Sequence, residues 1–230
     1  MPWVSTRPGP SSSIRISATS ARPRITCTRR RFWSRTYPRS ESSGAGQVFS
    51  TVKLWRSLNL RLRHLRLLWS ARRDSAAALR ARGGRRILVL CHGNIYRSPF
   101  VEQRLRALLD DRWEIRSAGF HHRTGRSSAA DYVAMARDYG VDLSGHRSRQ
   151  VDCREIESAD LVVIMDRRNH DELCALCPQT RGKIVWIGFG LRDGLPEVPD
   201  PWGQPAARTK AILARLNRAT EALAGHLSGP

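Results

Sequence analysis

Residues 87–99 bring together the residue types that cleave a phosphate ester with a cysteine nucleophile. Four apolar residues lead into Cys91, five residues separate Cys91 from Arg97, and Ser98 and Pro99 follow. A thiolate is a strong nucleophile, and a guanidinium offers a planar pair of N–H donors that matches two phosphate oxygens. The segment therefore predicts a phosphate-binding loop that carries its own nucleophile.

The elements around this loop would place the thiol beside a helix N-terminus. The apolar run predicts a buried strand that ends at Cys91, and we expect Ser98 to cap the following helix and Pro99 to be its first residue. Four apolar residues recur at helical spacing after the loop: Val101, Leu105, Leu108 and Leu109. Backbone N–H groups and the positive end of a helix dipole attract anions, so they favour both a bound phosphate and a thiolate.

The same chemistry needs an acid that protonates the leaving oxygen. The best-placed candidate is Asp200, which lies in the rigid segment 198–202, Val-Pro-Asp-Pro-Trp, beyond the last predicted strand. Because ligands of parallel sheets bind at the carboxyl ends of the strands, we expect Asp200 on the side that carries Cys91. Ser98 is expected to donate a hydrogen bond that keeps the thiolate ionised.

The second part of the chain alternates strands with helices. The predicted strands are 86–90, 113–117, 159–166 and 183–187, and the predicted helices are 99–109, 127–139, 167–176 and 206–227. Strands that are separated by helices form parallel sheets with helices on both faces. The expected fold class is α/β, a three-layer sandwich with a four-stranded parallel, Rossmann-like sheet flanked by helices.

Residues 1–84 differ from the rest of the chain in charge. They hold 18 of the 40 lysines and arginines but only two of the 20 acidic residues. Residues 1–51 are rich in Ser, Arg, Thr and Pro without apolar periodicity, so we expect a disordered basic leader. Three interpretations stay open for it: an arm for nucleic acid or anionic surfaces, an organelle transit peptide, or sequence upstream of a wrongly assigned start.

Residues 52–84 predict a basic amphipathic helix that ends in a Gly-Gly linker. Seven apolar residues share one helical face, and most of the basic residues lie on the other: Leu54, Trp55, Leu58, Leu62, Leu65, Leu68 and Trp69. Such a face packs against its own domain, against a second copy or against a membrane surface. Gly83 and Gly84 end the helix and precede a domain that spans residues 85–230.

Composition disfavours several classes of protein. The five cysteines are an odd number without framework spacing, which favours a reducing compartment and a cytoplasmic location. The sequence contains no run of 18 consecutive apolar residues, so we expect no membrane span, and no secretory signal is visible. We expect no cofactor, no metal and, for the catalytic domain, no nucleic acid partner.

These segments, with three others, resemble the low-molecular-weight protein tyrosine phosphatases. The matches follow the family's order over about residues 85–227: Cys91-His92-Gly93-Asn94-Ile95-Tyr96-Arg97-Ser98-Pro99, Ser117-Ala118-Gly119, Asp142-Leu143-Ser144-Gly145-His146-Arg147-Ser148-Arg149-Gln150, Met165-Asp166 with Asn169, and Asp200-Pro201-Trp202. A cysteine and an arginine at this spacing would be a weak signal alone, but several segments in register are a strong one. The resemblance implies a hydrolase, a protein phosphatase that dephosphorylates phosphotyrosine through a phosphocysteine and without metal.

The resemblance also implies roles for individual residues. Cys91 is the expected nucleophile, Arg97 the phosphate clamp, and Asp200 the acid for cleavage and the base for hydrolysis. The rest of the loop and one aromatic residue are expected to contact the substrate: His92, Gly93, Asn94, Ile95, Tyr96, Ser98 and Trp202. The resemblance further implies that Asn94, Ser98 and His146 brace the loop through hydrogen bonds, with Ser117 as additional support.

Two loop positions bear on specificity and on protection of the nucleophile. The related protein arginine phosphatases carry threonine where Ile95 stands, so Ile95 favours the tyrosine-directed form, and Trp202 offers a stacking face for an aryl ring. Tyr96 stands where the family commonly has a second cysteine, which forms a reversible disulfide with the nucleophile. We therefore expect Cys91 to be more prone to irreversible oxidation unless another thiol substitutes.

Three other functions remain as hypotheses. The first is a thiol-dependent arsenate reductase on the same fold, which would need Cys174 or Cys177. The others are a protein arginine phosphatase and a catalytically idle module that binds phosphoproteins. For Cys174 and Cys177 we expect free thiols, with a redox partner for Cys91 or a zinc site as alternatives, and Cys153 carries no signal.

Overall fold

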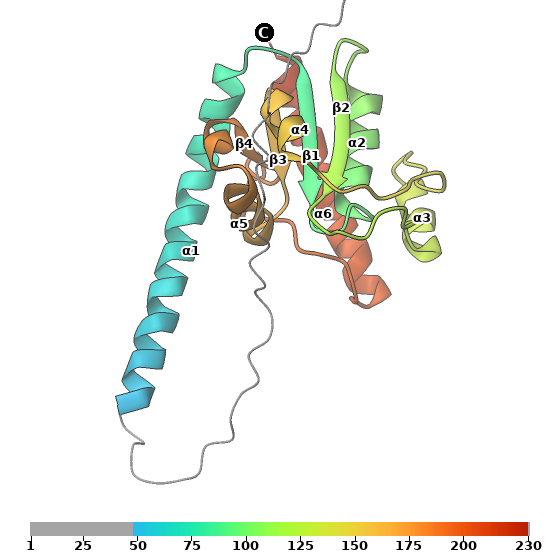
Figure 1. Cartoon of the computed structure of the whole chain (residues 1–230). Helices are drawn as coiled ribbons and strands as arrows, with labels where there is room; N and C mark the ends of the chain where they lie inside the picture. Colours follow the sequence, from blue (N-terminus) through green and yellow to red (C-terminus); the bar gives the residue numbers. More distant parts are fainter. Residues whose placement is uncertain (1–47, 230) are drawn as a thin grey trace, which may run out of the picture. The chain divides into compact units, whose positions relative to one another are not determined.

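Four parallel strands form the sheet that positions residues 91–97 (Figure 1). The structure, a computed structural model, describes residues 48–229. The strands lie in the order β2-β1-β3-β4 and have these bounds: β1 Arg86–Cys91, β2 Glu114–Gly119, β3 Leu161–Ile164 and β4 Ile184–Trp186. In this register Cys91, the last residue of central strand β1, pairs with Gly119, the last residue of β2.

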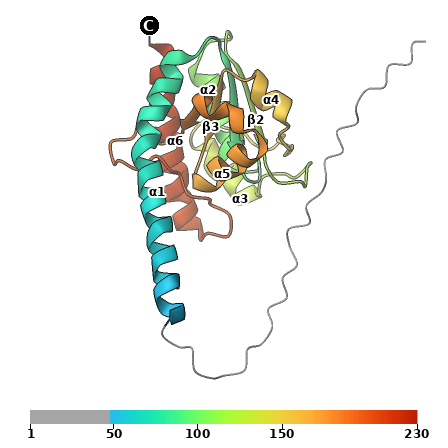
Figure 2. The same ribbon diagram turned by 60° about the vertical axis from the view of Figure 1, so that its left-hand side comes forward.

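Helices cover both faces of the sheet because its central strands are apolar on both sides. Residues 87–91 of β1 and all of β3 are buried, as expected for strands between two helical layers. The remaining elements are α1 Val48–Ala81, α2 Arg97–Leu108, α3 Ala130–Arg137, α4 Cys153–Ser158, α5 Arg167–Leu176, the 3-10 helix η1 Pro178–Lys183 and α6 Ala206–Ser228. Helices α2 and α6 pack together on one face, and Figure 2 shows α4 and α6 on opposite sides of the sheet. The predicted fold class is confirmed.

Helix α1 is one continuous helix of 34 residues, and its last turns belong to the packed domain. The backbone N–H of Trp186 in β4 donates to the Ser75 hydroxyl over 3.0 Å, and three neighbours on α1 are buried: Ala71, Ala78 and Leu79. Within the part of the chain that is described, no helix is long and apolar enough to cross a membrane.

The predicted leader, residues 1–51, falls mainly outside the described residues. Its predicted end is wrong, because α1 already begins at Val48. Packing of the whole Leu/Trp face on the domain, one of the three alternatives, is not seen where side chains are described: Leu62, Leu65 and Trp69 are exposed, and Leu68 is half-buried. The fully buried residues of α1 come later in the helix: Ala71, Ser75, Ala78 and Leu79.

Aspartate side chains cap two of the helices, α4 and α5. The Asp152 carboxylate accepts from the backbone N–H of Glu155 and caps α4, and the Asp166 carboxylate accepts from the N–H of Asn169 and caps α5. Helix α4 was not predicted, because its six residues contain a single buried apolar side chain, Ile156. The predicted strand 159–166 is shortened at its end because Asp166 serves as this cap.

Helix α2 begins differently from the prediction. Its first residue is Arg97, Tyr96 precedes it without a side-chain capping bond, and Ser98 lies inside the first turn. The prediction that Ser98 is the cap is therefore wrong. The predicted helix 127–139 is also shorter, since the Ser128 hydroxyl donates to the carbonyl of Ile95 at 2.5 Å instead of joining the helix.

Candidate active site

Cys91 ends β1 with its thiol in a polar setting. The backbone N–H of Asn94 donates to Cys91 Sγ over 3.2 Å, and Ser98 Oγ lies 3.1 Å from the same sulfur. Ser98 Oγ is also 3.3 Å from the carbonyl of Ala118. Since a hydroxyl has one proton, Ser98 can donate it to Ala118 beside a thiol or to the sulfur beside a thiolate. The sulfur therefore lies within reach of two hydrogen-bond donors.

The N-terminus of α2 adds to this effect. The helix starts directly after the loop, and its first turn contains no acidic side chain. The first N–H groups of a helix have no partner within the helix, and its dipole places positive charge there. The loop and the helix start together form a binding site for an anion next to Cys91.

Asn94 holds the loop in its conformation. It has a φ of +50°, which is uncommon for a residue with a side chain, and it is fully buried. Its amide nitrogen donates to Ser98 Oγ and Ser117 Oγ, both at 3.0 Å, and its Oδ1 accepts from the N–H of Arg149 at 2.9 Å. His146 Nε2 lies 2.7 Å from the Asn94 carbonyl, so this nitrogen carries the proton. The bonds fix a backbone geometry that would otherwise be strained.

Gly119 allows the loop to approach β2 closely. A Cβ at this position would lie 2.8 Å from the carbonyl oxygen of His92 and 2.9 Å from the backbone nitrogen of Asn94. Both atoms belong to the backbone of the loop and cannot rotate away. Only glycine therefore fits beside the loop without displacing it.

Arg97 is almost fully buried, with 1% of its surface exposed. Its Nη1 donates to Asp166 Oδ2 at 2.5 Å and to the carbonyl of Val198 at 3.0 Å, and its Nη2 lies 2.8 Å from Asp200 Oδ2. Burial alone lowers the pKa of Arg97, but the charges of Cys91, Asp200 and Asp166 raise it more, so the guanidinium is charged. Within residues 48–229 no group pairs with its Nε, and a buried donor without a partner favours an anionic ligand.

Asp200 enters the site from a short loop that is attached to the sheet. The N–H of Val198 donates to the carbonyl of Met165 at 2.8 Å, directly after β3. Asp200 Oδ1 accepts from the N–H of Trp202 at 3.2 Å, a local turn that orients the carboxyl, and Oδ2 faces Arg97. The carboxyl is partly exposed, so it can exchange protons with solvent and with a ligand in the pocket.

His92 is held in one tautomer by two charged neighbours. Arg168 Nη2 lies 2.9 Å from His92 Nε2, and His92 Nδ1 lies 2.9 Å from Glu172 Oε1. Arginine can only donate, so Nε2 accepts and the proton sits on Nδ1, where it is donated to the carboxylate. The imidazole thus connects the loop to α5.

These groups surround a pocket of about 290 Å³. Its lining consists of Cys91, His92, Gly93, Ile95, Tyr96, Arg97, His121, Arg126, Arg168, Asp200 and Trp202. Ile95 supplies an apolar wall, and the Tyr96 ring has its centroid 6.0 Å from that of Trp202 and 4.5 Å from that of Tyr132. The aromatic wall suits a planar ring, and the cysteine and the arginine suit a phosphate attached to it.

Two residues expected to bind substrate are placed elsewhere. Asn94 and Ser98 are fully buried behind the loop and do not line this pocket. Their side chains have no access to a ligand because they bond each other over 3.0 Å. Both are loop supports, as His146 and Ser117 are.

Two pocket residues, Arg126 and Arg168, were not predicted from the sequence. Arg126 donates to the carbonyl of Gly93 at 2.8 Å, Arg168 bonds His92, and His121 also lines the pocket, as a loop residue near the cleft. Burial, followed by the positive charge of Arg126, lowers the pKa of His121. No spacing signal marks Arg126 and Arg168, because they approach from segments that are distant from the loop in sequence.

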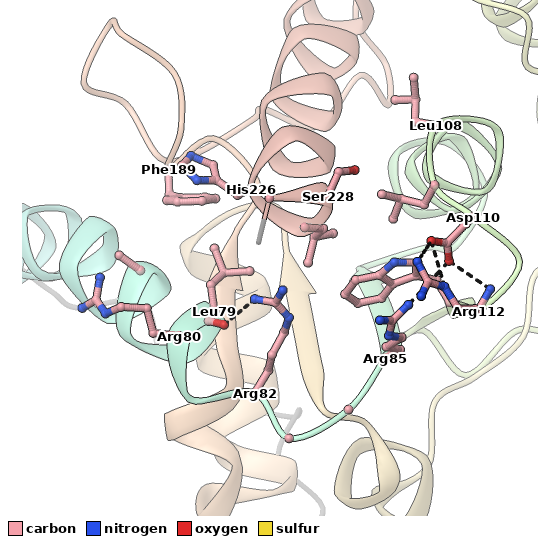
Figure 3. Close-up of a pocket in the computed structure, with 17 residues that line it drawn as sticks. Leu79, Arg80, Arg82, Arg85, Leu108, Asp110, Arg112, Phe189, His226 and Ser228 are labelled. Atoms are coloured by element: carbon pink, nitrogen blue, oxygen red, sulfur yellow. Dashed lines mark hydrogen bonds and ion pairs between the residues drawn. The ribbon is translucent and has the colours of Figure 1, made fainter.

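A larger hollow of about 900 Å³ lies near the start of β1 (Figure 3). Arg82 and Arg85 each place their guanidinium carbon 5.7 Å from the ring centroid of Trp113. Arg82 also donates to the carbonyl of Leu79, and Arg112 pairs with Asp110 at 2.5 Å. The hollow has no cysteine in its lining, and these arginines are already engaged, so the smaller pocket is the better candidate site.

Metal ligands are not grouped in the pocket. Among residues 48–229, one group of three side chains could hold a metal ion: Cys153, Glu157 and Cys177. None of the three lines the pocket.

Comparison with known proteins agrees with this geometry. The sequence model of the low molecular weight phosphotyrosine protein phosphatases matches residues 86–229. The chain is 33% identical to the low molecular weight protein-tyrosine-phosphatase Wzb of Escherichia coli K12 over 132 residues, 57% of this chain and 88% of that protein. It resembles the crystal structure of the Erwinia amylovora tyrosine phosphatase AmsI with a TM-score of 0.59 and 30% identity, over 64% of this chain and 95% of that one.

A further similar structure is the YwlE arginine phosphatase from Geobacillus stearothermophilus. It matches with a TM-score of 0.56 and 25% identity, over 62% of this chain and 92% of that one. Because the family model spans more than half of the chain, the assignment does not depend on any single relative. The chain belongs to the low molecular weight phosphotyrosine protein phosphatase family.

Proposed function

We propose that this protein hydrolyses phosphotyrosine on protein substrates through a phosphocysteine formed on Cys91. The observation that carries the proposal is the convergence of a thiol, a buried guanidinium and a carboxyl on one pocket, which has an aromatic wall. Wzb and AmsI, which the chain resembles, are named as tyrosine phosphatases. Each of the three polar groups has a distinct part in the reaction.

In the first step Cys91 Sγ attacks phosphorus. A sulfur–phosphorus bond forms, the bond from phosphorus to the tyrosine oxygen breaks, and Asp200 gives its proton to that oxygen. Arg97 and the loop N–H groups hold the phosphate oxygens as charge moves onto them. The aromatic wall of Tyr96 and Trp202 holds the ring of the leaving tyrosine.

In the second step water attacks the phosphocysteine. Asp200, now a carboxylate, accepts a proton from the water, the sulfur–phosphorus bond breaks, and inorganic phosphate and the Cys91 thiolate are released. The Ser98 hydroxyl and the Asn94 N–H stabilise the sulfur as it regains its charge. Cys91 and Asp200 therefore return to their starting states, and no cofactor takes part in either step.

Arg97 contacts both the phosphate site and the expected acid. Its Nη2 lies 2.8 Å from Asp200 Oδ2. A phosphate in the pocket would compete with Asp200 for the same guanidinium.

A side-by-side phosphate-release assay on phosphotyrosine, phosphoserine and phosphoarginine peptides tests the proposal. We expect release from phosphotyrosine to dominate, because Ile95 and the aromatic wall offer apolar contacts to an aryl ring. Preferred release from phosphoarginine would instead support the activity named for YwlE. No release from any peptide, with phosphate still bound, would support an idle binding module.

An arsenate reductase would need a second thiol near the nucleophile. Cys91 is the one cysteine among the residues that line the pocket, and Cys177 lies beside Cys153 instead. Arsenate turnover that depends on thioredoxin and on Cys174 or Cys177 would nevertheless replace the phosphatase proposal.

We also propose that the protein acts in the cytoplasm.

We further propose that residues 52–70 bind an anionic membrane surface. Leu65 and Trp69 are 60% and 86% exposed on α1, and residues 52–70 contain five basic residues and no acidic one. These positive charges would repel the same segment of a second copy, and they would attract anionic lipid headgroups. Cosedimentation with phosphatidylserine vesicles should be lost in a Leu65→Glu, Trp69→Glu variant; a dimer without vesicle binding would support self-association instead.

A further inference from the structure

Two cysteines that are distant in sequence meet on the side of the sheet that α4 covers. Cys153 is the first residue of α4, and Cys177 follows the last residue of α5, 24 positions later. Their sulfur atoms are 2.6 Å apart, closer than two unbonded sulfur atoms normally approach. Cys177 is fully buried and Cys153 is half-buried, so one thiol is accessible from solvent and the other lies behind it.

The backbone around Cys177 is held firmly. Its N–H donates to the carbonyl of Leu173 at 2.8 Å, and its own carbonyl accepts from the Thr180 hydroxyl at 2.7 Å. Cys153 lies in the first turn of α4, which is fixed by the cap at Asp152. The two sulfur atoms are therefore kept in contact by the fold.

The surroundings of Cys177 favour the neutral thiol. Burial, the neighbouring Cys153 and Glu157 together raise the pKa of Cys177 to about 12, and Lys183 offsets this only in part. At neutral pH the buried sulfur is thus protonated and is not a strong nucleophile in isolation. The half-buried Cys153 is the sulfur that a dissolved oxidant can reach first.

We propose that Cys153 and Cys177 form a redox modification site, which peroxide converts into a disulfide between the start of α4 and the end of α5. The proposal is independent of the phosphatase reaction, because neither cysteine lines the catalytic pocket.

The chemistry proceeds in two balanced steps. Hydrogen peroxide transfers one oxygen atom to Cys153, which becomes a sulfenic acid, and the first water is released. Cys177 sulfur then attacks Cys153 sulfur, the sulfur–oxygen bond breaks, and the Cys177 proton leaves with the hydroxyl as the second water. Two thiols lose two hydrogens and one peroxide is reduced to two waters; a dithiol reductant reverses the change.

A zinc site is the alternative use of these residues, and it fits less well. Two thiolates on a tetrahedral zinc ion stay roughly 3.8 Å apart, given zinc–sulfur bonds of about 2.3 Å. The third candidate ligand, Glu157, already accepts from the amide of Gln179 at 2.7 Å. The group holds three potential ligands within the described residues, whereas structural zinc sites use four.

The disulfide would restrain the helix that supports the catalytic loop. The cap of α5, Asp166, holds Arg97, and Arg168 on its first turn holds His92. Oxidation would tie the other end of α5 to α4 and close a loop that contains β3. Such a cross-link lowers the conformational entropy of the unfolded chain and therefore raises the temperature of unfolding.

Peptide mapping of the full chain tests the proposal. Protein treated with hydrogen peroxide is alkylated, digested without reductant and analysed by mass spectrometry. We expect a cross-linked peptide pair containing Cys153 and Cys177, lighter than the two thiol peptides by two hydrogens and lost after dithiothreitol. Cys153→Ser should abolish it, and Cys174→Ser is the matched control that retains it, since Cys174 contacts His170 rather than a second cysteine.

Thermal unfolding supplies a second measurement that does not depend on a buried substitution. Oxidised wild type should unfold about 6–12 °C above the reduced protein, and the Cys153→Ser variant should show no such shift. Separate alkylated Cys153 and Cys177 peptides after peroxide treatment would overturn the proposal. Zinc bound one per chain in the purified protein and lost in Cys153→Ser would also overturn it, in favour of a metal site.

Discussion

Cys91 and Cys177 are both buried, with 2% and 0% of their surface exposed, but they adjoin opposite ends of helices and have different neighbours. Cys91 precedes the N-terminus of α2 and receives hydrogen bonds at its sulfur. Cys177 follows the C-terminus of α5, where the helix dipole is negative, and Glu157 and Cys153 lie beside it.

The comparison shows that burial alone does not decide what a cysteine does. The free energy of a thiolate depends on the donors and dipoles directed at it, and these depend on which end of a helix the cysteine adjoins. Cys91 adjoins a helix N-terminus and contacts Asn94 and Ser98, whereas Cys177 adjoins a helix C-terminus and contacts Cys153.

Substituting each of the two cysteines in turn should give the largest difference in the rate of phosphate release. We expect Cys91→Ser to reduce turnover of an aryl phosphate to background, because the hydroxyl is a far weaker nucleophile in this setting. Cys177→Ala should retain the wild-type rate in the presence of reductant. Steady-state phosphate release measures both, and phosphate binding by the Cys91 variant shows that its loop is intact. Equal losses in the two variants would remove the distinction.

Asp200→Asn should reduce the rate by roughly 10²–10⁴-fold for a phosphotyrosine peptide, since asparagine cannot donate the proton. The loss should be much smaller for nitrophenyl phosphate, whose leaving group needs little protonation. Comparing kcat for the two substrates checks this. A loss of the same size on both would indicate that Asp200 acts by positioning Arg97.

Arg97→Lys should cost roughly 10²–10³-fold in kcat/KM. Lysine keeps the charge but loses the planar pair of donors, and it cannot bond Asp166, Asp200 and a phosphate together. Inhibition by inorganic phosphate should weaken in parallel. Unchanged inhibition would show that the loop N–H groups alone bind the anion.

The smallest expected effect concerns pH and Cys177. The pKa of Cys177 in the folded protein, about 12, lies above the ordinary thiol value, so the folded state holds this proton more tightly than the unfolded state. The contribution of Cys177 to the free energy of unfolding is therefore complete below the ordinary thiol pKa and is lost as pH rises toward 12. Between pH of about 7 and about 10, the unfolding midpoint of reduced wild type should fall more than that of Cys177→Ala. Parallel slopes for the two proteins would show that Cys177 does not cause the loss of stability.

The parts of the fold that repeat apolar patterns could be predicted from the sequence. All four strands and the order of strand and helix follow from runs such as residues 87–90 and 161–164, which are buried on both faces. Helix α4 could not, because one apolar residue in six gives no periodicity. The cap of α2 was assigned incorrectly because Ser98 bonds the thiol and Asn94, and tertiary contacts outweighed its local preference.

The candidate site could be predicted where its residues are contiguous in sequence. The loop and Asp200 lie in short segments, but Arg126 and Arg168 reach the pocket only through tertiary structure. The contact of Cys153 with Cys177 has the same origin, since neither residue carries a spacing signal.

The most direct test of the account is to trap the covalent intermediate. Asp200→Ala protein, mixed with a phosphotyrosine peptide and quenched in acid, should carry one phosphate on the peptide that contains Cys91, because loss of the base slows hydrolysis of the phosphocysteine. Digestion and mass spectrometry locate the modification. A phosphate on another residue, or steady release of phosphate with Cys91 replaced by serine, would contradict the assignment of Cys91 as the nucleophile.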